Sequence, residues 1–556
     1  MNKILNRFFD DISPIFMIGV LLVSSFVVAQ DNDDDVEEIV VKGNVLYSDQ
    51  VNALKTPVPI MDVPQTVSIV TDEDIRKQGL REIGDIVRYT PGVNTSQGEG
   101  HRDAVVFRGV RSTADFFQDG NRDDVQYYRS LYNVEQVEIL RGPNALLFGR
   151  GGTGGVINRV SKKAALGETF GAVDFGLDSF GANDIAVDYN TGTGDSTAVR
   201  MMIHSDALEN HRDHYDGRRL GFNPTVKIQM NDTTTLDISY EHADHERYID
   251  RGVPTENGEP VERFEKITFG GNENLTTLKA NILRATLSKQ FSDTRKGNLS
   301  VVSSDFEKMY KNYYASGYTA GASVVTMDGY LDPTERENTI ISGSMVNEVG
   351  KHTLLVGAEL IDTTNNNHRY NTFWSTTSDD NEVFTITRPM NFTVNSAGVA
   401  TNNDYTADLK SKTKSDIDVT SIYIQDQIDV SDKLKLMVGG RHDSFDITVT
   451  DIKAGSAQSR KDSKFSPRAG VIFKPQDNIS WYYSYSESFL PRSGEQYKKL
   501  TASAAALDPD VYESSEVGVK WAISDDLSFT AAYFDSEQTV ATRDESGESA
   551  EIVGLQ

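Results

Sequence analysis

The most prominent chemical motif in the sequence is a run of glycines. Gly149-Arg150-Gly151-Gly152-Thr153-Gly154 matches G-x-G-x-x-G, the fingerprint of dinucleotide-binding proteins. That fingerprint must open a helix inside a βαβ unit, because the helix N-terminus receives the pyrophosphate. Here the run leads into residues 156–160, Val-Ile-Asn-Arg-Val, which favour a strand. A tight turn is therefore the preferred interpretation. An exported nucleotide-binding oxidoreductase remains the enzyme alternative.

Histidines form the second candidate site. Of the 9 histidines, those between residues 204 and 245 include His211-x-x-His214 and His242-x-x-His245. On a strand this spacing points the two rings to opposite faces, whereas in loops the rings could converge on a metal. Solvated loop histidines are the favoured interpretation, and no metal site is assigned.

Composition excludes several classes of protein. The 556 residues include 83 acidic and 55 basic side chains, a formal net charge of −28, and no cysteine. Nucleic acid is an improbable partner because binding phosphates requires a basic surface. Thiolate metal sites, thiol nucleophiles and disulfides are excluded. With 23 Tyr and 25 Phe the chain reads as a large, acidic, aromatic-rich β protein.

The N-terminal region predicts export. The apolar run Ile15 to Ala29 follows Lys3 and Arg7 and ends in small residues. It is shorter than the ~20 residues of a membrane span, so we interpret 1–29 as a signal peptide cleaved after Ala29. Residues 30–55 then form an acidic linker. Within it, residues 36–42 are β-prone and could add as a strand to a partner's sheet edge.

Residues 56–165 predict a small α+β domain. Thr71 and Asp74 have the spacing of a capping box, and the helix that they open should end at Gly79. A second helix fits Leu80, Ile83, Ile86 and Val87. Short strands are expected at 104–108, 116–119, 134–140 and 155–160.

Several motifs of this domain occur in a familiar order. They are Val63-Pro64-Gln65-Thr66-Val67, Arg88-Tyr89-Thr90-Pro91-Gly92, Phe107-Arg108-Gly109, Asp119-Gly120, Glu138-Ile139-Leu140-Arg141-Gly142-Pro143 and Leu147-Phe148-Gly149-Arg150-Gly151. Together they resemble the plug domain of TonB-dependent siderophore receptors of the bacterial outer membrane, most closely the catecholate branch. The resemblance implies a plug inside a 22-stranded antiparallel β-barrel.

The resemblance also implies a function and partners. Glu37, Glu38, Ile39, Val40, Val41 and Lys42 look like the TonB box, which pairs with TonB, energised by ExbB and ExbD. The cargo would be a ferric siderophore, so iron arrives as cargo and no resident cofactor is expected. The receptor is expected to be a monomer in outer-membrane lipid. A receptor for a hydroxamate, haem, cobalamin or a Zn or Cu complex is the alternative.

The residues of 166–556 predict a membrane β-barrel independently. Segments such as Leu434-Leu436-Val438 and Ile479-Trp481-Tyr483-Tyr485 alternate with polar or small residues, as when one face meets lipid and the other a lumen. Short polar turns alternate with long loops. The long loops are expected at 206–218, 244–278, 308–337, 362–417, 446–463 and 490–513. We count fifteen strands, with Glu551–Gln556 beginning a sixteenth. Plugged barrels have about 22, so we expect a fragment that lacks the C-terminal part.

The resemblance also suggests site residues. Arg108 and Arg141 would meet barrel glutamates and latch the plug, and Glu516 matches one of these glutamates. Cargo would contact the outward apex of the plug, where arginine supplies charge-assisted bonds and aromatic rings supply stacking surface. The predicted cargo residues are Gln97, His101, Arg102, Arg122, Tyr127, Tyr128 and Arg129.

Overall fold

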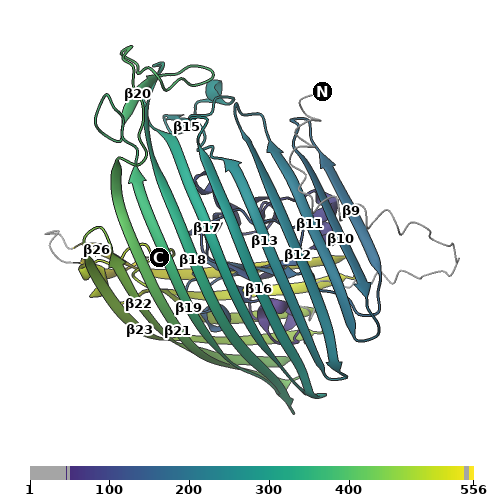
Figure 1. Cartoon of the computed structure of the whole chain (residues 1–556). Helices are drawn as coiled ribbons and strands as arrows, with labels where there is room; N and C mark the ends of the chain where they lie inside the picture. Colours follow the sequence, from purple (N-terminus) through teal and green to yellow (C-terminus); the bar gives the residue numbers. More distant parts are fainter. Residues whose placement is uncertain (1–45, 47–50, 544–549, 556) are drawn as a thin grey trace, which may run out of the picture. The chain divides into compact units, whose positions relative to one another are not determined.

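The structure is a computed structural model of the chain, and it describes residue 46, residues 51–543 and residues 550–555. All of these residues belong to one compact unit, Asn44–Gln556. It contains a small N-terminal α+β part, called the plug below, and a large antiparallel sheet, called the wall (Figure 1). The predicted signal peptide and the predicted box at 37–42 lie outside the described residues.

The plug is built from short elements. They are η2 (Asn52–Leu54), η3 (Ile60–Asp62), β1 (Val67–Thr71), α3 (Asp72–Gln78), α4 (Ile83–Val87), β2 (Val93–Thr95), η4 (Gly98–Gly100), β3 (Val105–Phe107), β4 (Val110–Ser112), β5 (Phe116–Gln118), β6 (Asn121–Arg122), β7 (Val134–Arg141), α5 (Ala145–Phe148) and β8 (Gly155–Ser161). Five of the strands form one sheet in the order β1-β7-β8-β5-β6, and β2-β3-β4 form a second.

Local sequence explains the helices of the plug. The Thr71 side chain accepts from the Asp74 backbone N–H while the Asp74 carboxylate accepts from the Thr71 N–H, so the predicted capping box is confirmed. The helix ends at Gly79, whose φ of 63° suits a residue without a Cβ. The apolar side chains of α4, Ile83, Ile86 and Val87, are buried in the plug core.

The wall consists of long strands that pair antiparallel in chain order. They are β9 (Phe170–Leu177), β10 (Asn183–Gly192), β11 (Thr197–Glu209), β12 (Asp216–Asn231), β13 (Thr234–Tyr248), β16 (Leu275–Ser292), β17 (Arg295–Tyr318), β18 (Val324–Val349), β19 (His352–Asn371), β21 (Asp408–Ser431), β22 (Leu434–Asp451), β23 (Ser456–Gln476), β24 (Ile479–Leu490), β25 (Asp510–Ser524), β26 (Leu527–Arg543) and β27 (Ala550–Leu555). The expected fifteen to sixteen strands agree with this set.

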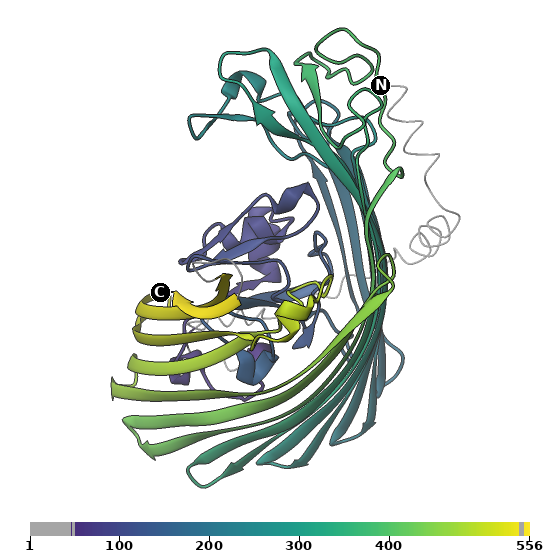
Figure 2. The same cartoon turned by 90° about the vertical axis from the view of Figure 1, so that its left-hand side faces the viewer.

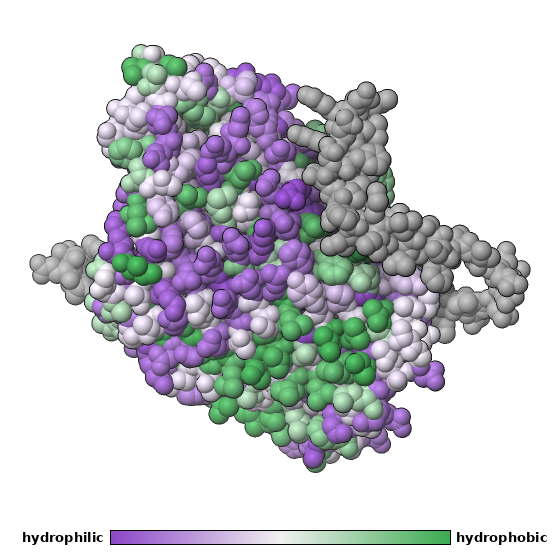
Figure 3. Space-filling view, in the orientation of Figure 1, coloured by the Kyte–Doolittle hydropathy of each residue, from purple (hydrophilic) through white to green (hydrophobic). Residues whose placement is uncertain are grey.

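Alternation decides which side chains face outward. Large apolar side chains on the outer face are exposed, among them Leu360, Ile422, Phe465 and Trp481. Figure 3 shows apolar residues gathered over the part of the wall near the short turns. Such a band on a sheet whose other face packs against polar and buried groups is typical of strands that face lipid. Among the described residues, none of the helices combines the length and the apolarity that crossing a membrane requires.

The sheet has two end strands. β9 pairs with β10 and β27 pairs with β26, and no pairing joins β9 to β27 within the described part of the chain. Figure 2 shows the wall as an open arc around the plug. The structure therefore contains a large part of a barrel wall.

The long loops are shorter than the sequence predicts. Residues 308–337 were expected to be a loop, yet β17 continues to Tyr318 and β18 begins at Val324. The expected loops 362–417 and 446–463 are likewise taken up in part by β19, β21, β22 and β23. The physical reason is that these strand ends lie beyond the apolar band, where both faces are polar and the period-2 signal fades although the ladder continues. Remaining irregular segments hold β14 (Thr255–Glu256), β15 (Glu259–Pro260), η5 (Glu262–Phe264), β20 (Glu382–Thr385) and α6 (Ala502–Ala505).

Candidate functional site

A small pocket lies where the plug apex meets the wall near the long hairpins. Glu99, His101 and Arg102 come from η4 and the residues that follow it, and Gln126 comes from a later plug loop. The backbone of η4 makes a sharp turn: Glu99 has a φ of 57° and is flanked by Gly98 and Gly100, also at positive φ. This turn places the side chains of Glu99, His101 and Arg102 at the pocket.

The wall contributes most of the charge. Lys308 and Tyr310 of β17, Asp332 of β18 and Arg369 of β19 line the pocket, together with Lys498 from the loop between β24 and β25. The pocket therefore has four basic side chains against two acidic ones. In a chain with a net charge of −28 this local excess of basic side chains indicates a site for an anion.

Ion pairs fix the geometry of these side chains. Arg369 donates two hydrogen bonds to the Asp332 carboxylate, from Nε at 2.7 Å and from Nη2 at 2.5 Å. Lys498 lies 3.5 Å from the same carboxylate. Arg102 pairs with Glu99 at 3.3 Å. Burial lowers the pKa of Lys498, and Asp332 partly offsets this. The cations are thus held in place before any ligand arrives.

Aromatic rings flank the cations. Tyr310 and Tyr330 lie 5.4 Å apart between ring centroids, and the Tyr330 hydroxyl donates to Glu99 at 2.9 Å. The Arg369 guanidinium stands 4.0 Å from the centre of the Tyr330 ring, and Arg251 stands 4.2 Å from that of Tyr314. Flat rings next to guanidinium groups form a surface on which a planar, electron-rich ligand ring can stack.

The structure divides the predicted cargo residues into three groups. His101 and Arg102 line the pocket. Gln97 and Tyr128 lie beside it: the Gln97 side chain donates to the Asp250 carbonyl at 2.7 Å, and Tyr128 donates to the Gln97 carbonyl at 3.2 Å. Arg122, Tyr127 and Arg129 do not line the pocket: Arg122 donates to the Phe148 carbonyl, and Tyr127 and Arg129 contact Asp123. Their role as cargo contacts remains a prediction.

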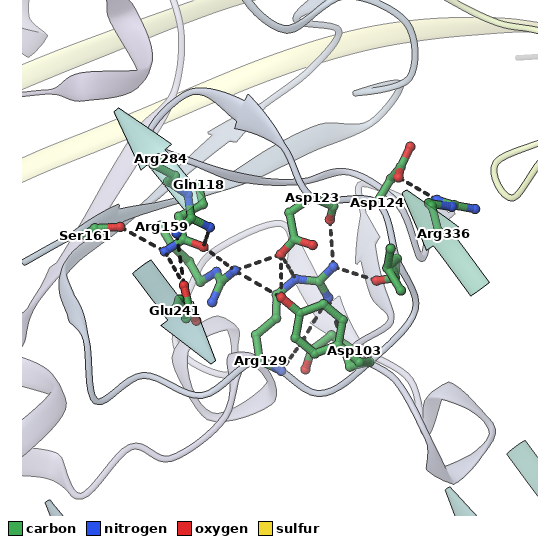
Figure 4. A network of polar contacts seen from close by, with 12 residues as sticks. Asp103, Gln118, Asp123, Asp124, Arg129, Arg159, Ser161, Glu241, Arg284 and Arg336 are labelled. Atoms are coloured by element: carbon green, nitrogen blue, oxygen red, sulfur yellow. Dashed lines mark hydrogen bonds and ion pairs between the residues drawn. The ribbon is translucent and has the colours of Figure 1, made fainter. Parts of the chain in front are cut away.

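Arg129 is the centre of a buried network. Its guanidinium contacts Asp123 at 2.9 Å and Asp103 at 3.3 Å, and donates to the carbonyls of Val125 and Tyr127 (Figure 4). Tyr127 donates to Asp123 at 2.8 Å. Burial alone would raise the pKa of Asp123, but Arg129 and Arg159 outweigh it and lower that pKa. For Asp103 burial dominates and raises the pKa to about 6.

Replacing Arg129 with Met should therefore destabilise the plug strongly. Asp103 and Asp123 would stay buried with less or no compensating charge, which costs about 3–5 kcal/mol. Thermal unfolding of the purified receptor and proteolysis of the plug measure this effect. Arg111→Met, at an exposed plug position, is the control and should change neither. Equal stability of the two variants would contradict this role.

The same network reaches the wall. Arg284 of β16 donates to the Gln118 side chain at 2.6 Å and lies 3.1 Å from Glu241 of β13. Arg336 of β18 contacts Asp124 of the plug at 2.6 Å. Figure 4 shows these pairs on the two sides of Arg129. The plug loop that carries residues 118–129 is therefore fastened to three wall strands by charged contacts.

The predicted latch residues Arg108 and Glu516 meet at β25 of the wall. Arg108 NH1 lies 2.5 Å from Glu516 Oε2 of β25, and both side chains are buried. Arg141 lies nearby and donates to the Ser68 hydroxyl. Burial, and then the charge of Arg108, lower the pKa of Arg141 to about 10. One carboxylate thus faces two buried guanidinium groups of the plug.

The remaining motifs find structural roles. The glycine run opens no helix but leads into β8, and the Gly151 N–H donates to the Phe489 carbonyl of β24 at 2.8 Å. It is a turn that contacts the wall, which removes the basis of the oxidoreductase alternative. His242 and His245 lie on β13, whereas His211 and His214 lie in the loop before β12. No group of three or more His, Cys, Asp or Glu suited to a metal occurs in the described residues.

Sequence reasoning missed the wall half of the pocket. Lys308, Asp332 and Arg369 lie on neighbouring strands, within a segment of 62 residues. The alternation of side chains along a strand could have revealed these residues. On β17 the even-numbered positions 306, 308, 310 and 312 are buried and face inward. Lys308 and Tyr310 therefore occupy inward positions, where a long basic and a large aromatic side chain can reach the plug.

Comparisons with known proteins agree with this architecture. Residues 210–539 match the family model described as "TonB dependent receptor-like, beta-barrel", and residues 59–156 match the "TonB-dependent Receptor Plug Domain". The chain is similar to three receptors in particular.

The probable TonB-dependent siderophore receptor PiuA of Acinetobacter baumannii is 25% identical over 89% of this chain and 71% of its own length. The ferrioxamine B receptor of Salmonella typhimurium is 25% identical over 91% and 72%. The catecholate siderophore receptor Fiu of Escherichia coli is 24% identical over 95% and 76%. The crystal structure of PiuA superposes with a TM-score of 0.81 at 21% identity, covering 92% of this chain and 77% of that one. Because the barrel model alone matches more than half of its residues, the chain belongs to the family of TonB-dependent receptors, which are β-barrel proteins of the bacterial outer membrane.

Proposed function

We propose that this receptor imports a ferric siderophore, most closely of the catecholate class, across the outer membrane. The observation that carries the proposal is the basic and aromatic pocket between plug apex and wall, in a strongly acidic chain. A ferric tris-catecholate is a trianion with flat rings, which suits Arg369, Lys498 and the Tyr330 ring. The relatives named for siderophores, Fiu among them, support the same class of cargo.

The energy for import would come from outside the receptor. Glu37–Lys42 would pair as a strand with TonB, which ExbB and ExbD energise. Cargo iron enters as the chelate, so the receptor itself needs no resident cofactor. In this proposal the signal peptide is cleaved after Ala29 and the mature receptor works as a monomer.

We also propose that the wall is part of a 22-stranded barrel. Two free sheet edges expose rows of unpaired N–H and C=O groups, and lipid cannot satisfy them. The curvature of the arc in Figure 2 and the 71% coverage of the PiuA receptor support further strands between β27 and β9.

A binding titration tests the cargo class. The purified receptor should bind a hexadentate iron(III) tris-catecholate more tightly than a neutral iron(III) tris-hydroxamate. Arg369→Gln should weaken binding of the catecholate about 10- to 100-fold, since a charge-assisted contact contributes about 1.5–3 kcal/mol. Arg295→Gln, at an exposed position near the opposite end of the wall, is the control. Tighter binding of the hydroxamate would favour the alternative cargo, for which similarity to the ferrioxamine B receptor speaks.

A further inference from the structure

The His101 ring sits between two basic side chains. Its Nδ1 lies 2.7 Å from Lys308 Nζ and its Nε2 lies 2.8 Å from Arg102 NH1. The ring is buried and stacks against Tyr310, with 3.9 Å between ring centroids. Both distances are those of hydrogen bonds, so each contact needs one donor and one acceptor.

Only one assignment of protons satisfies both contacts. A guanidinium carries donors alone and stays charged, so Nε2 must accept from Arg102. A neutral imidazole has one acceptor and one N–H, which places the proton on Nδ1. This N–H points at Lys308, and an ammonium has no lone pair to accept it. The contact is a hydrogen bond only when Lys308 is an uncharged amine.

The surroundings of Lys308 agree with this state. Lys308 is 7% exposed, and within the described residues no carboxylate lies at ion-pair distance from it. Asp332 pairs with Arg369 and Lys498. Glu99 contacts Arg102 and Tyr330 and lies 3.8 Å from His101 Nε2. The charged groups that face Lys308 are thus Arg102, Lys498 and Arg369, balanced in part by Asp332 and Glu99. Burial that no counter-charge compensates favours the uncharged amine of a lysine.

His101 supports the assignment from the other side. Burial is the first cause that holds the pKa of His101 well below its usual value, so the ring remains neutral in the physiological range. An imidazolium would present two donors to two donors, so neither the contact at 2.7 Å nor the one at 2.8 Å would have an acceptor. The Glu99 carboxylate lies 3.8 Å from Nε2, beyond hydrogen-bond distance.

We propose that Lys308 determines the charge of the cargo that the pocket accepts: it is uncharged in the empty pocket and becomes an ammonium when an anionic chelate enters. The anionic oxygens supply the counter-charge that the empty pocket lacks. The amine gains a proton from solvent and, as an ammonium, donates to these oxygens in place of its contact with the His101 Nδ1–H. Binding of an anion is therefore coupled to proton uptake, whereas a neutral chelate induces none. This inference rests on the proposed function, because it concerns the same cargo and pocket.

Calorimetry measures the coupling directly. Titrating the receptor in detergent with an iron(III) tris-catecholate, in two buffers of different ionisation enthalpy, should give an uptake of about one proton per chelate bound. Since the complex binds more protons than its separate components, affinity rises as pH falls, by at most about tenfold per pH unit. Lys308→Met should bind more weakly and without proton uptake. Lys311→Met, three residues along β17 and facing outward, should retain it.

The outcomes separate this inference from the proposed function. Tight binding without proton uptake, or the same uptake in Lys308→Met, would overturn the role of Lys308 while leaving the cargo class intact. Should neither chelate bind, the proposed function fails, and the empty pocket is then tested alone. Nitrogen-15 NMR of labelled histidine, with His101 identified by its loss in His101→Asn, should show a neutral ring protonated at Nδ1. A proton on Nε2, or an imidazolium, would refute the assignment.

Discussion

Glu516→Ala is expected to loosen the plug and make cells that carry the receptor sensitive to bulky antibiotics that the outer membrane normally excludes. Glu516 Oε2 contacts Arg108 at 2.5 Å, and its Oε1 accepts from the Thr66 N–H at 3.1 Å and the Tyr482 hydroxyl at 2.5 Å. The variant removes the counter-charge of a buried guanidinium and leaves it beside Arg141. Breaking a buried pair from one side costs about 3–5 kcal/mol.

Two variants make this test specific. Glu516→Gln keeps the shape and one acceptor, and should fall between wild type and the alanine variant. Glu513→Ala, three residues earlier on β25 and on its outer face, removes a carboxylate that the plug does not touch. Antibiotic susceptibility and the rate of plug proteolysis measure the effect. If Glu516→Ala behaves like Glu513→Ala in both, the pair does not latch the plug.

Sequence predicts this molecule best where structure is local. Thr71, Asp74 and Gly79 specify a helix within nine residues, and the structure has it with both hydrogen bonds of the capping box. The short turns of the wall were predictable for the same reason, since polar turn residues interrupt a period-2 pattern. The end of β17 and the start of β18, which flank the connection between them, could not be predicted, because no apolar face distinguishes these residues as strand.

The candidate site shows the limit more clearly. His101 and Arg129 look alike in sequence, as polar plug residues near the predicted apex, yet one lines the pocket and the other binds two buried aspartates. Only packing separates these roles. Lys308 reaches His101 across 207 residues of chain, and that meeting depends on how the plug is seated inside the wall. Arg108 and Glu516 could be paired beforehand because the resemblance supplied the partner.

Deleting residues 37–42 is expected to abolish uptake while leaving cargo binding unchanged. The pocket lies at the apex and needs nothing from this segment, so the dissociation constant should stay within about twofold of wild type. Uptake should fall to the level of cells without the receptor, measured with a radioactive iron chelate. The matched control is deletion of the acidic run 31–35, which removes a stretch of similar length and leaves the predicted box in place.

Uptake should depend on residues 37–42 because several contacts hold the N-terminal part of the plug in place. Any pull on 37–42 passes along the chain to Asn52 and Ala53, whose N–H groups donate to the buried Glu138 carboxylate at 2.6 and 2.8 Å. The next contacts along the chain are those of η3, where Lys474 and Lys435 lie 2.9 and 3.1 Å from Asp62. Lys520 donates to the carbonyls of Ile60 and Val63, at 2.6 Å each. A ligand can break these contacts only if it binds more tightly to a plug in which they are broken than to the plug described here. The apex pocket touches none of these contacts. A force applied to the N-terminal segment reaches these contacts before any other part of the plug and can break them one after another. Cargo uptake that persisted without residues 37–42 would therefore rule out coupling through this segment.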